Sequence, residues 1–521
     1  MALLPQIIQT LASRFTSLVF SSAHKPALTL SASSAVYAAM SVKAKPVDPL
    51  VVILGSTGTG KSDLAVELAV RFGGEIINAD AMQMYRGLPV VSNQITEAEQ
   101  RGVPHHLLAH ISLDEETWAV GDWKRKTQAL IEDIRSRGKL PIVVGGTHYY
   151  LNGLLFEDNL VTGETDKVTE FPILDEPTDV LYAKLKEVDP VMAARWHPND
   201  RRKIRRSLEI FLRMGCKASD IYAEQRLRQQ GSVAGLTEVP GDSKPWETLL
   251  FWVYSEPETL KTRLDKRVDK MEHVGLMAEI QEMFAYLAAK KATGSPVDMT
   301  RGIWQTIGFK EFRAYLEMTN SKSAQTDAAT LEALKVQAIE DMKTATRQYA
   351  RSQIRWIRRK LIPLLKEEPD AIGKLFLVDS TDVSAYAHTV VGSAATLTQA
   401  FLNGDTLPAP EEVSDVARDQ LRAADEPVKP RTIPIKKTCE LCHLTLVSED
   451  QWQKHIKSRR HHRVAKNAKK RALATIPGQD VQDVLVADEA MVNEEAVNEE
   501  TIDDLGFHEP DENTNQQQSC Q

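Results

Sequence analysis

The chain of 521 residues contains few cysteines and no long apolar run. Four cysteines in this length are too few for a disulfide framework, and they favour a reducing compartment. No stretch of 18 or more consecutive apolar residues occurs, so we expect no membrane-spanning helix and no membrane partner. Apolar residues make up 42% and charged residues 26%, which is the balance of a folded protein long enough for several domains.

Acidic residues are absent from the N-terminal stretch. Residues 1–47 contain no Asp or Glu but four basic residues and many Ser and Ala, a composition typical of a mitochondrial transit peptide. A disordered extension is the alternative. A second start at Met40 would produce an untargeted form, so we expect mitochondrial and cytoplasmic proteins, with the nucleus also open to the shorter form.

Basic residues are absent from the C-terminal stretch. Residues 475–521 contain thirteen Asp and Glu and no Lys or Arg. We therefore expect 473–521 to be an acidic, disordered tail. Because this tail holds so much negative charge, the rest of the chain is net positive although the whole carries −8, and a nucleic-acid partner is not excluded.

Residues 51–62 read VVILGSTGTGKS and combine a predicted strand with a phosphate-binding loop. The glycines let backbone N–H groups converge on a phosphate, Lys61 adds a positive charge and Ser62 offers a hydroxyl to Mg²⁺. A predicted helix over 63–71 turns its positive end toward the same anion. The predicted phosphate-binding residues are Gly55, Ser56, Thr57, Gly58, Thr59, Gly60, Lys61 and Ser62.

Further predicted strands alternate with helices, which indicates an α/β fold with a parallel sheet of the P-loop NTPase type. Asp80 follows the strand predicted at 75–78 and so falls at the edge where such sheets bind ligands. The strand predicted at 141–144 ends in Gly-Gly-Thr147, without the Asp or Glu that an NTP hydrolase needs. A hydrolytic function is therefore disfavoured.

Two segments predicted to be helical are basic. One includes Arg201, Arg202 and Arg205. The other, over 328–361, places Arg347, Arg351 and Arg355 four residues apart, with aromatic residues interleaved. Such stripes contact nucleic-acid phosphates in some proteins, although a basic run is more often only a solvated helix face.

Near the C-terminus the spacing C-x₂-C-x₁₂-H-x₅-H predicts a small C2H2 zinc finger. Two thiolates and two imidazoles suit a closed, tetrahedral structural Zn²⁺ site. The predicted ligands are Cys439, Cys442, His455 and His461, with His462 as an alternative fourth ligand. Eight basic residues over 457–471 favour contact with a polyanion.

These signals divide the chain into seven parts. They are a transit or disordered segment (1–47), the first part of the catalytic P-loop core (48–156), a helical insertion domain (157–245), the second part of the core with the basic helix (246–404), a linker (405–434), the zinc finger with its basic tail (435–472) and the acidic tail (473–521).

Eight motifs occur in the order found in one protein family. They are GSTGTGKS at 55–62, DAMQMYRG at 80–87, PHH at 104–106, GGTHYY at 145–150, HPNDRRKIRRSLEIF at 197–211, RLDKRVDKM at 263–271, GIWQTIGFKE at 302–311 and TRQYARSQIRW at 346–356. Over roughly 48–402 the chain resembles the tRNA dimethylallyltransferases, also called tRNA isopentenyltransferases. The zinc finger and the candidate presequence make it similar to their eukaryotic branch. Ala81 stands where the family usually has Ser.

The resemblance implies transfer of a dimethylallyl group from dimethylallyl diphosphate to N6 of adenine 37 in the tRNA anticodon loop, by a monomer. The loop and a Mg²⁺ would hold the diphosphate, Asp80 would act as general base, and Thr147 and Arg267 would line the reaction channel. The implied tRNA contacts are Asp80, Ala81, Met82, Gln83, Arg201, Arg202, Arg205, Arg347, Arg351 and Arg355. A P-loop kinase of a nucleoside or small metabolite and a non-catalytic nucleic-acid-binding protein remain the alternatives.

Overall fold

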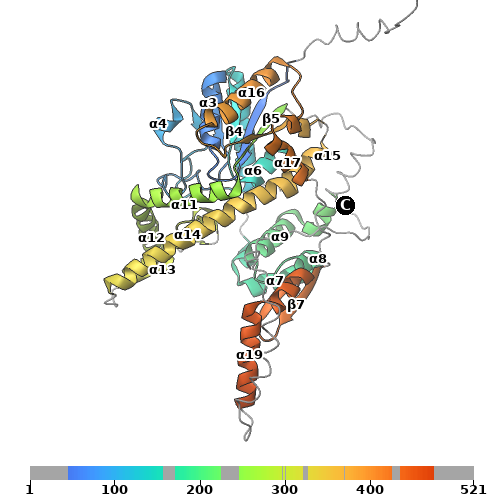
Figure 1. Cartoon of the computed structure of the whole chain (residues 1–521). Coiled ribbons are helices and arrows are strands. Elements are labelled where there is room, and N and C mark those ends of the chain that lie inside the picture. The colour runs from blue at the N-terminus through green and yellow to red at the C-terminus, as the bar shows by residue number, and fades with distance from the viewer. Residues whose placement is uncertain are drawn as a thin grey trace, which may run out of the picture.

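The centre of the protein is a six-stranded parallel sheet with the strand order β3-β2-β4-β1-β5-β6 (Figure 1). The computed structural model describes residues 45–474, except 116, 157–170, 225–245, 296, 300, 321–326, 369 and 425–433. The strands are β1 (Leu50–Gly55), β2 (Gly74–Asn78), β3 (His105–His106), β4 (Leu140–Val144), β5 (Thr248–Tyr254) and β6 (Leu375–Asp379). The predicted α/β fold with a P-loop sheet is confirmed.

Apolar side chains of β1 point alternately to the two faces of the sheet. Val51 and Ile53 join the apolar cluster beneath α3 (Lys61–Phe72) and α16 (Ser393–Asn403), while Val52 and Leu54 join the cluster beneath α5 (Val120–Ser136) and α6 (His148–Leu155). A strand buried on both faces reads as a continuous apolar run, which is why the sequence pattern identified it.

A second group of helices runs past the sheet (Figure 1). It consists of α11 (Pro257–His273), α12 (Leu276–Ala292), α13 (Arg313–Thr319) and α14 (Ala328–Trp356), which continues through a π-helical turn at Ile357–Leu361 into α15 (Ile362–Glu367). Leu260 and Leu264 of α11 pack against Ala350 of α14. Helices α11 and α12 are separated at Gly275, the N-cap of α12, which has a φ of 119°.

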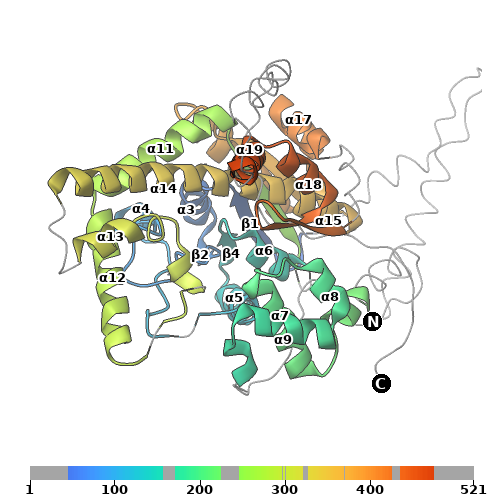
Figure 2. The same ribbon diagram turned by 90° about the horizontal axis from the view of Figure 1, so that it is seen from below.

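The insertion is helical and has its own apolar cluster, which includes Leu181, Trp196 and Leu208. Its helices are α7 (Thr178–Val188), α8 (Pro190–Arg195) and α9 (Arg201–Met214). From below, they lie to one side of the core, and α12 and α13 lie at the far end of α14 (Figure 2). Residues 157–170, at the start of the predicted insertion, lie outside the described part, and α7 begins at Thr178.

The zinc-finger segment forms two antiparallel strands and two helices beside the insertion. They are β7 (Pro434–Cys439), β8 (Leu444–Ser448), α18 (Glu449–Ile456) and α19 (Arg459–Ala474). The His197 side chain hydrogen-bonds the Thr445 carbonyl through Nε2 at 3.0 Å, which joins the insertion to β8. This contact brings together two segments that both carry clustered basic residues.

The prediction of a linker over 405–434 is wrong in part. Helix α17 (Asp415–Ala423) lies within it, and Ala417 and Leu421 are buried in the main core. Pro and charge dominate the composition, but two apolar residues one turn apart are enough to hold a short helix against the core.

The short helix α4 (Glu97–Gln100) lies between β2 and β3 in the chain. The predicted transit segment, apart from residues 45–47, and the acidic tail beyond residue 474 lie outside the described residues. Among the helices that are described, none has the length and apolar character to span a bilayer.

Candidate active site

Residues 55–62 form a preformed loop between β1 and α3. The Thr59 hydroxyl donates to the Ser56 carbonyl at 2.9 Å, and Lys61 Nζ donates to the same carbonyl at 2.6 Å. Gly60 has a φ of 89° and packs against the ring of Tyr386, a conformation and a close approach that a side chain would oppose. These contacts within the loop and with Tyr386 hold its curve.

The end of β2 is joined to the end of β4 by backbone contacts. A Cβ at Gly145 would overlap the backbone of Ala79, so only glycine permits this approach. The Thr147 N–H donates to the Ala79 carbonyl at 3.2 Å, and the Thr147 hydroxyl accepts from the Ala81 N–H at 3.0 Å. Asn78 holds the next turn by accepting from the Asp80 N–H at 3.1 Å. Thr147 and Asp80 therefore share one edge of the sheet.

Asp80, Lys61 and Arg267 form a shielded cluster of charges. Burial raises the pKa of Asp80 against the opposing effect of both cations, and burial lowers the pKa of Lys61 to about 8. Burial also lowers the pKa of Arg267 to about 10, although Asp80 favours its charged form. Two cations and one carboxylate leave an excess positive charge, which a bound anion would neutralise.

Arg267 also contacts the loop directly. Its Nη1 donates to the Thr57 hydroxyl at 2.8 Å, whereas its buried Nε has no hydrogen-bond partner among the residues that the structure describes. A buried cation with an unused donor beside a phosphate loop fits an oxyanion. The structure thus brings Asp80, Thr147, Arg267 and the predicted loop residues together.

Helix α14 adds side chains that the sequence did not reveal as site residues. Gln353 donates through Nε2 to the Gly146 carbonyl at 2.9 Å and accepts from the Thr57 N–H at 2.8 Å. One turn earlier, the shielded hydroxyl of Tyr349 interacts with Thr147, and burial raises its pKa. Residues four apart lie on one helix face, so the spacing of Tyr349 and Gln353 was the available signal, although the arginines of the same helix repeat at that spacing too.

His148 and Trp356 close another side of the site. Their rings stack with centroids 5.4 Å apart, and His148 is buried. Burial lowers the pKa of His148 to about 3, so the imidazole stays neutral at physiological pH.

The residues that follow Asp80 and the arginines of α9 differ from one another in burial and in hydrogen bonding. Gln83 donates to the Asn93 carbonyl at 2.8 Å, while Ala81 and Met82 are half-buried. Arg201 and Arg205 donate to the Leu174 carbonyl at 3.2 and 3.3 Å, which gives both a role inside the insertion.

The arginines of α14 differ among themselves. Arg347 pairs with Asp265 of α11 at 3.3 Å, whereas Arg351 is exposed and has no ion pair or hydrogen bond within the described chain. Arg202 of α9 is exposed and Arg355 is half-buried. Arg351 is therefore the member of this stripe with the freest guanidinium for a phosphate.

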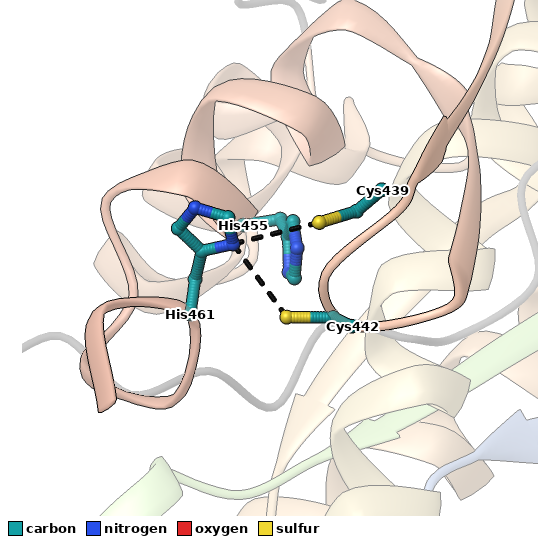
Figure 3. A group of neighbouring side chains, drawn as sticks. All are labelled: Cys439, Cys442, His455 and His461. Carbon is teal, nitrogen blue, oxygen red and sulfur yellow. Dashed lines mark hydrogen bonds between the residues drawn. The ribbon is translucent and has the colours of Figure 1, made fainter. Parts of the chain in front are cut away.

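The predicted zinc ligands converge on one point (Figure 3). One ligand atom from each of Cys439, Cys442, His455 and His461 lies within 4.8 Å of the others. His461 Nδ1 is 3.6 Å from Cys439 Sγ and 3.5 Å from Cys442 Sγ. Tetrahedral Zn–S and Zn–N bonds of about 2.3 and 2.0 Å place the sulfur and nitrogen ligand atoms about 3.5 Å apart, which matches these distances.

The environment of these four residues also fits zinc. His455 Nε2 is buried without a hydrogen-bond partner in the described structure, as an atom that binds a metal would be. Leu446 is buried beside them and supplies part of the small apolar core. His461, rather than His462, completes the cluster, so the alternative fourth ligand is not needed.

Comparisons with known proteins agree with this geometry. A family model described as IPP transferase matches residues 83–360, and one described as a zinc finger of C2H2 type matches residues 437–461. A tRNA dimethylallyltransferase of Schizosaccharomyces pombe is 40% identical over 445 residues, which cover 81% of this chain and 96% of that protein. The tRNA dimethylallyltransferase of Homo sapiens is 34% identical, over 79% of this chain and 85% of that protein.

A solved structure of a eukaryotic dimethylallyltransferase acting on tRNA is also similar. It superimposes with a TM-score of 0.63 at 33% identity, and the match covers 82% of this chain and 98% of that chain. The similarity therefore extends well beyond the phosphate loop.

Proposed function

The chain belongs to the tRNA dimethylallyltransferase family and is a prenyltransferase that acts on tRNA, and from this premise we propose how its residues carry out the transfer. The donor is dimethylallyl diphosphate and the acceptor is N6 of adenine 37. The new bond joins N6 to the first carbon of the prenyl group, and the bond from that carbon to the diphosphate oxygen breaks. Neither ATP nor a hydrolytic water takes part, which suits a phosphate loop without an acidic strand end.

The phosphate loop, Lys61 and Arg267 bind the diphosphate as it leaves. Negative charge grows on the diphosphate in the transition state, and two shielded cations stabilise it more strongly there than in water. The Ser62 hydroxyl, at the start of α3, has no hydrogen-bond partner in the described part of the chain and would bind a Mg²⁺. That ion, when bound, would neutralise further charge on the diphosphate.

Asp80 accepts the proton that N6 loses. An exocyclic adenine amine is a poor nucleophile because its lone pair is delocalised, so removal of the proton during bond formation assists the attack. Burial raises the pKa of Asp80, which makes its carboxylate a stronger base than an exposed aspartate. Thr147, whose oxygen is held by the Ala81 N–H, orients the amine beside Asp80.

The tRNA approaches from the side of α14 and the insertion. The target base leaves the stack of the anticodon loop to reach Asp80. This costs little free energy because the bases of the loop are unpaired. Arg351, Arg202 and the basic helix α19 supply phosphate contacts, with Gln83 close to the base. The protein acts as a monomer, since one chain holds both the donor site and these basic segments.

The observation that carries the proposal is the shared position of Asp80, Lys61 and Arg267 at the phosphate loop. Asp80→Asn keeps the shape and removes the base. We expect prenylation of an anticodon stem-loop to fall by at least ~10²-fold while tRNA affinity stays within about threefold. The measurement is single-turnover transfer of labelled dimethylallyl diphosphate, with filter binding for tRNA.

Asp133→Asn is the matched control, because Asp133 pairs with Arg137 on the surface of α5 away from the loop. It should leave the rate unchanged. Wild-type activity in Asp80→Asn would reject Asp80 as the base. Turnover of ATP without tRNA would instead support the kinase alternative.

A further inference from the structure

Gln353 spans the two halves of the active site. It is 3% exposed, and both ends of its amide form hydrogen bonds with backbone groups. Its oxygen accepts from the Thr57 N–H of the phosphate loop at 2.8 Å, and its nitrogen donates to the Gly146 carbonyl at 2.9 Å. A single side chain of α14 thus connects the donor side of the site to the turn after β4.

Each end of this bridge is next to a reacting group. Thr57 accepts from Arg267, which lies on the diphosphate side, through its hydroxyl at 2.8 Å. Gly146 precedes Thr147, whose oxygen is bound to the Ala81 N–H beside Asp80. The bridge therefore sets the separation between the group that binds the leaving diphosphate and the group that takes the proton.

The fit around the bridge is tight on the Gly146 side. A Cβ built on Gly146 would lie 2.5 Å from Gln353 Nε2 and 3.4 Å from Asp80 Oδ2. The first distance is too short for a non-bonded contact, and the second is an ordinary one. An alanine methyl at residue 146 would therefore displace the amide and leave the carboxylate in place.

The phosphate loop does not need Gln353 to keep its own shape. Thr59 and Lys61 both bind the Ser56 carbonyl, and the Tyr386 hydroxyl donates to the Gly60 carbonyl at 2.6 Å. These contacts remain when the amide is removed. Loss of Gln353 should therefore change the position of the loop relative to Thr147 more than it changes the shape of the loop.

We propose that Gln353 is a positioning residue for prenyl transfer, which fixes the diphosphate site relative to the base site; this rests on the proposed function. Its amide is engaged by the Thr57 N–H and the Gly146 carbonyl, and it acts through these two residues. A carboxamide has both the acceptor that the Thr57 N–H needs and the donor that the Gly146 carbonyl needs. Glu would face the Gly146 carbonyl with a second acceptor, and Met would offer neither group.

Gln353→Met tests this role because Met keeps the length and the apolar stem. Misplacement of reacting groups by a fraction of an ångström to 1 Å costs up to ~10² in rate. We expect kcat to fall about 10- to 100-fold, with KM for dimethylallyl diphosphate and Kd for tRNA each within about threefold of wild type. A merely structural role would lower the folded fraction and leave kcat per folded molecule unchanged.

Gln337→Met is the matched control on the same helix. Gln337 is exposed and donates only to Asp341 on the helix surface, at 2.9 Å. Its kcat and KM should equal those of wild type. The fraction of molecules that bind tRNA, measured by titration, corrects every rate for folding.

A double-mutant cycle keeps the proposal testable if the Met variant folds poorly. Gly146→Ala should lower kcat by pushing the amide away, whereas Gly373→Ala, where a Cβ would meet nothing within 4 Å, should not. In a Gln353→Ala background there is no amide to displace. Gly146→Ala should then cost less than about twofold.

Two results would overturn the inference. One is a kcat for folded Gln353→Met equal to that of wild type. The other is a double variant whose kcat falls by the product of the factors for Gly146→Ala and Gln353→Ala alone, which would mean that the two substitutions act independently. Wild-type protein assayed in parallel separates this failure from failure of the proposed function, because an enzyme without tRNA prenylation would be inactive before any substitution.

Discussion

Lys61 has a charge that a modest change of pH can remove from the free enzyme. Burial lowers its pKa to about 8, Asp80 opposes that effect and Arg267 adds to it. His148, whose pKa is lowered to about 3 by burial and by the charge of Lys61, is neutral across this range. A lysine is charged below its pKa, so the ammonium is lost as pH rises through about 8.

Asp80 and Lys61 lose their charges at opposite ends of the pH range. The raised pKa of Asp80 means that the carboxylate is lost as pH falls, and the Lys61 ammonium is lost as pH rises. We expect kcat/KM for dimethylallyl diphosphate to be bell-shaped, with its alkaline limb near pH 8, since this ratio reports the free enzyme. Bound diphosphate favours the ammonium, so the alkaline limb of kcat should lie higher.

Initial rates between about pH 5 and pH 10 at several donor concentrations measure both profiles. The buffers should have constant ionic strength, because screening changes the affinity for tRNA. A kcat/KM that stays constant through pH 9 would show that Lys61 keeps its charge in the empty loop.

Helix α14 joins the catalytic side chains to a basic surface. Its inner face carries Gln353 and its outer face carries Arg351. Arg351→Ala should weaken tRNA binding by about three- to tenfold and reduce the slope of log affinity against log salt by about 1, as loss of one phosphate contact does. Filter binding at several salt concentrations measures both quantities.

Arg347→Ala is the comparison on the same helix. Arg347 pairs with Asp265 and also donates to the Lys343 carbonyl at 3.2 Å, so its removal should cost stability, about 1 kcal/mol, rather than the salt slope. Equal salt slopes for wild type and Arg351→Ala would exclude a phosphate contact at residue 351.

At the scale of the whole molecule, the zinc finger is a module attached beside the insertion. Its four ligands lie within 4.8 Å of one another, and α19 carries most of its basic residues. Small zinc modules unfold without their metal. The double variant Cys439→Ser/Cys442→Ser should lose about one equivalent of zinc, raise KM for tRNA about tenfold and leave single-turnover chemistry at saturating tRNA within about threefold.

Elemental analysis and transfer kinetics check these values together. Cys216→Ser is the matched control, since Cys216 is a free cysteine outside the cluster. Freshly purified wild-type protein without zinc would reject the site. A large loss of chemistry at saturating tRNA would show that the finger acts on the catalytic core.

The sequence by itself determined the features that depend on neighbours along the chain. A buried strand followed by G-x-x-x-x-G-K-S predicted β1, the loop and α3, and Asp80 could be placed because β2 ends two residues before it. The spacing of Cys439, Cys442, His455 and His461 predicted a cluster that the structure confirms. Each of these signals reflects local backbone geometry or local ligand spacing.

Only the tertiary structure decided which distant residues meet. Thr57 is bound by Arg267, 210 residues away, and by Gln353, 296 residues away, and no local pattern records either contact. Periodicity shows which side chains share a helix face, but packing between elements decides what that face touches. For this reason Arg347 and Arg351 looked alike as a basic stripe, although Arg347 pairs with Asp265 and Arg351 is exposed without an ion pair in the described chain.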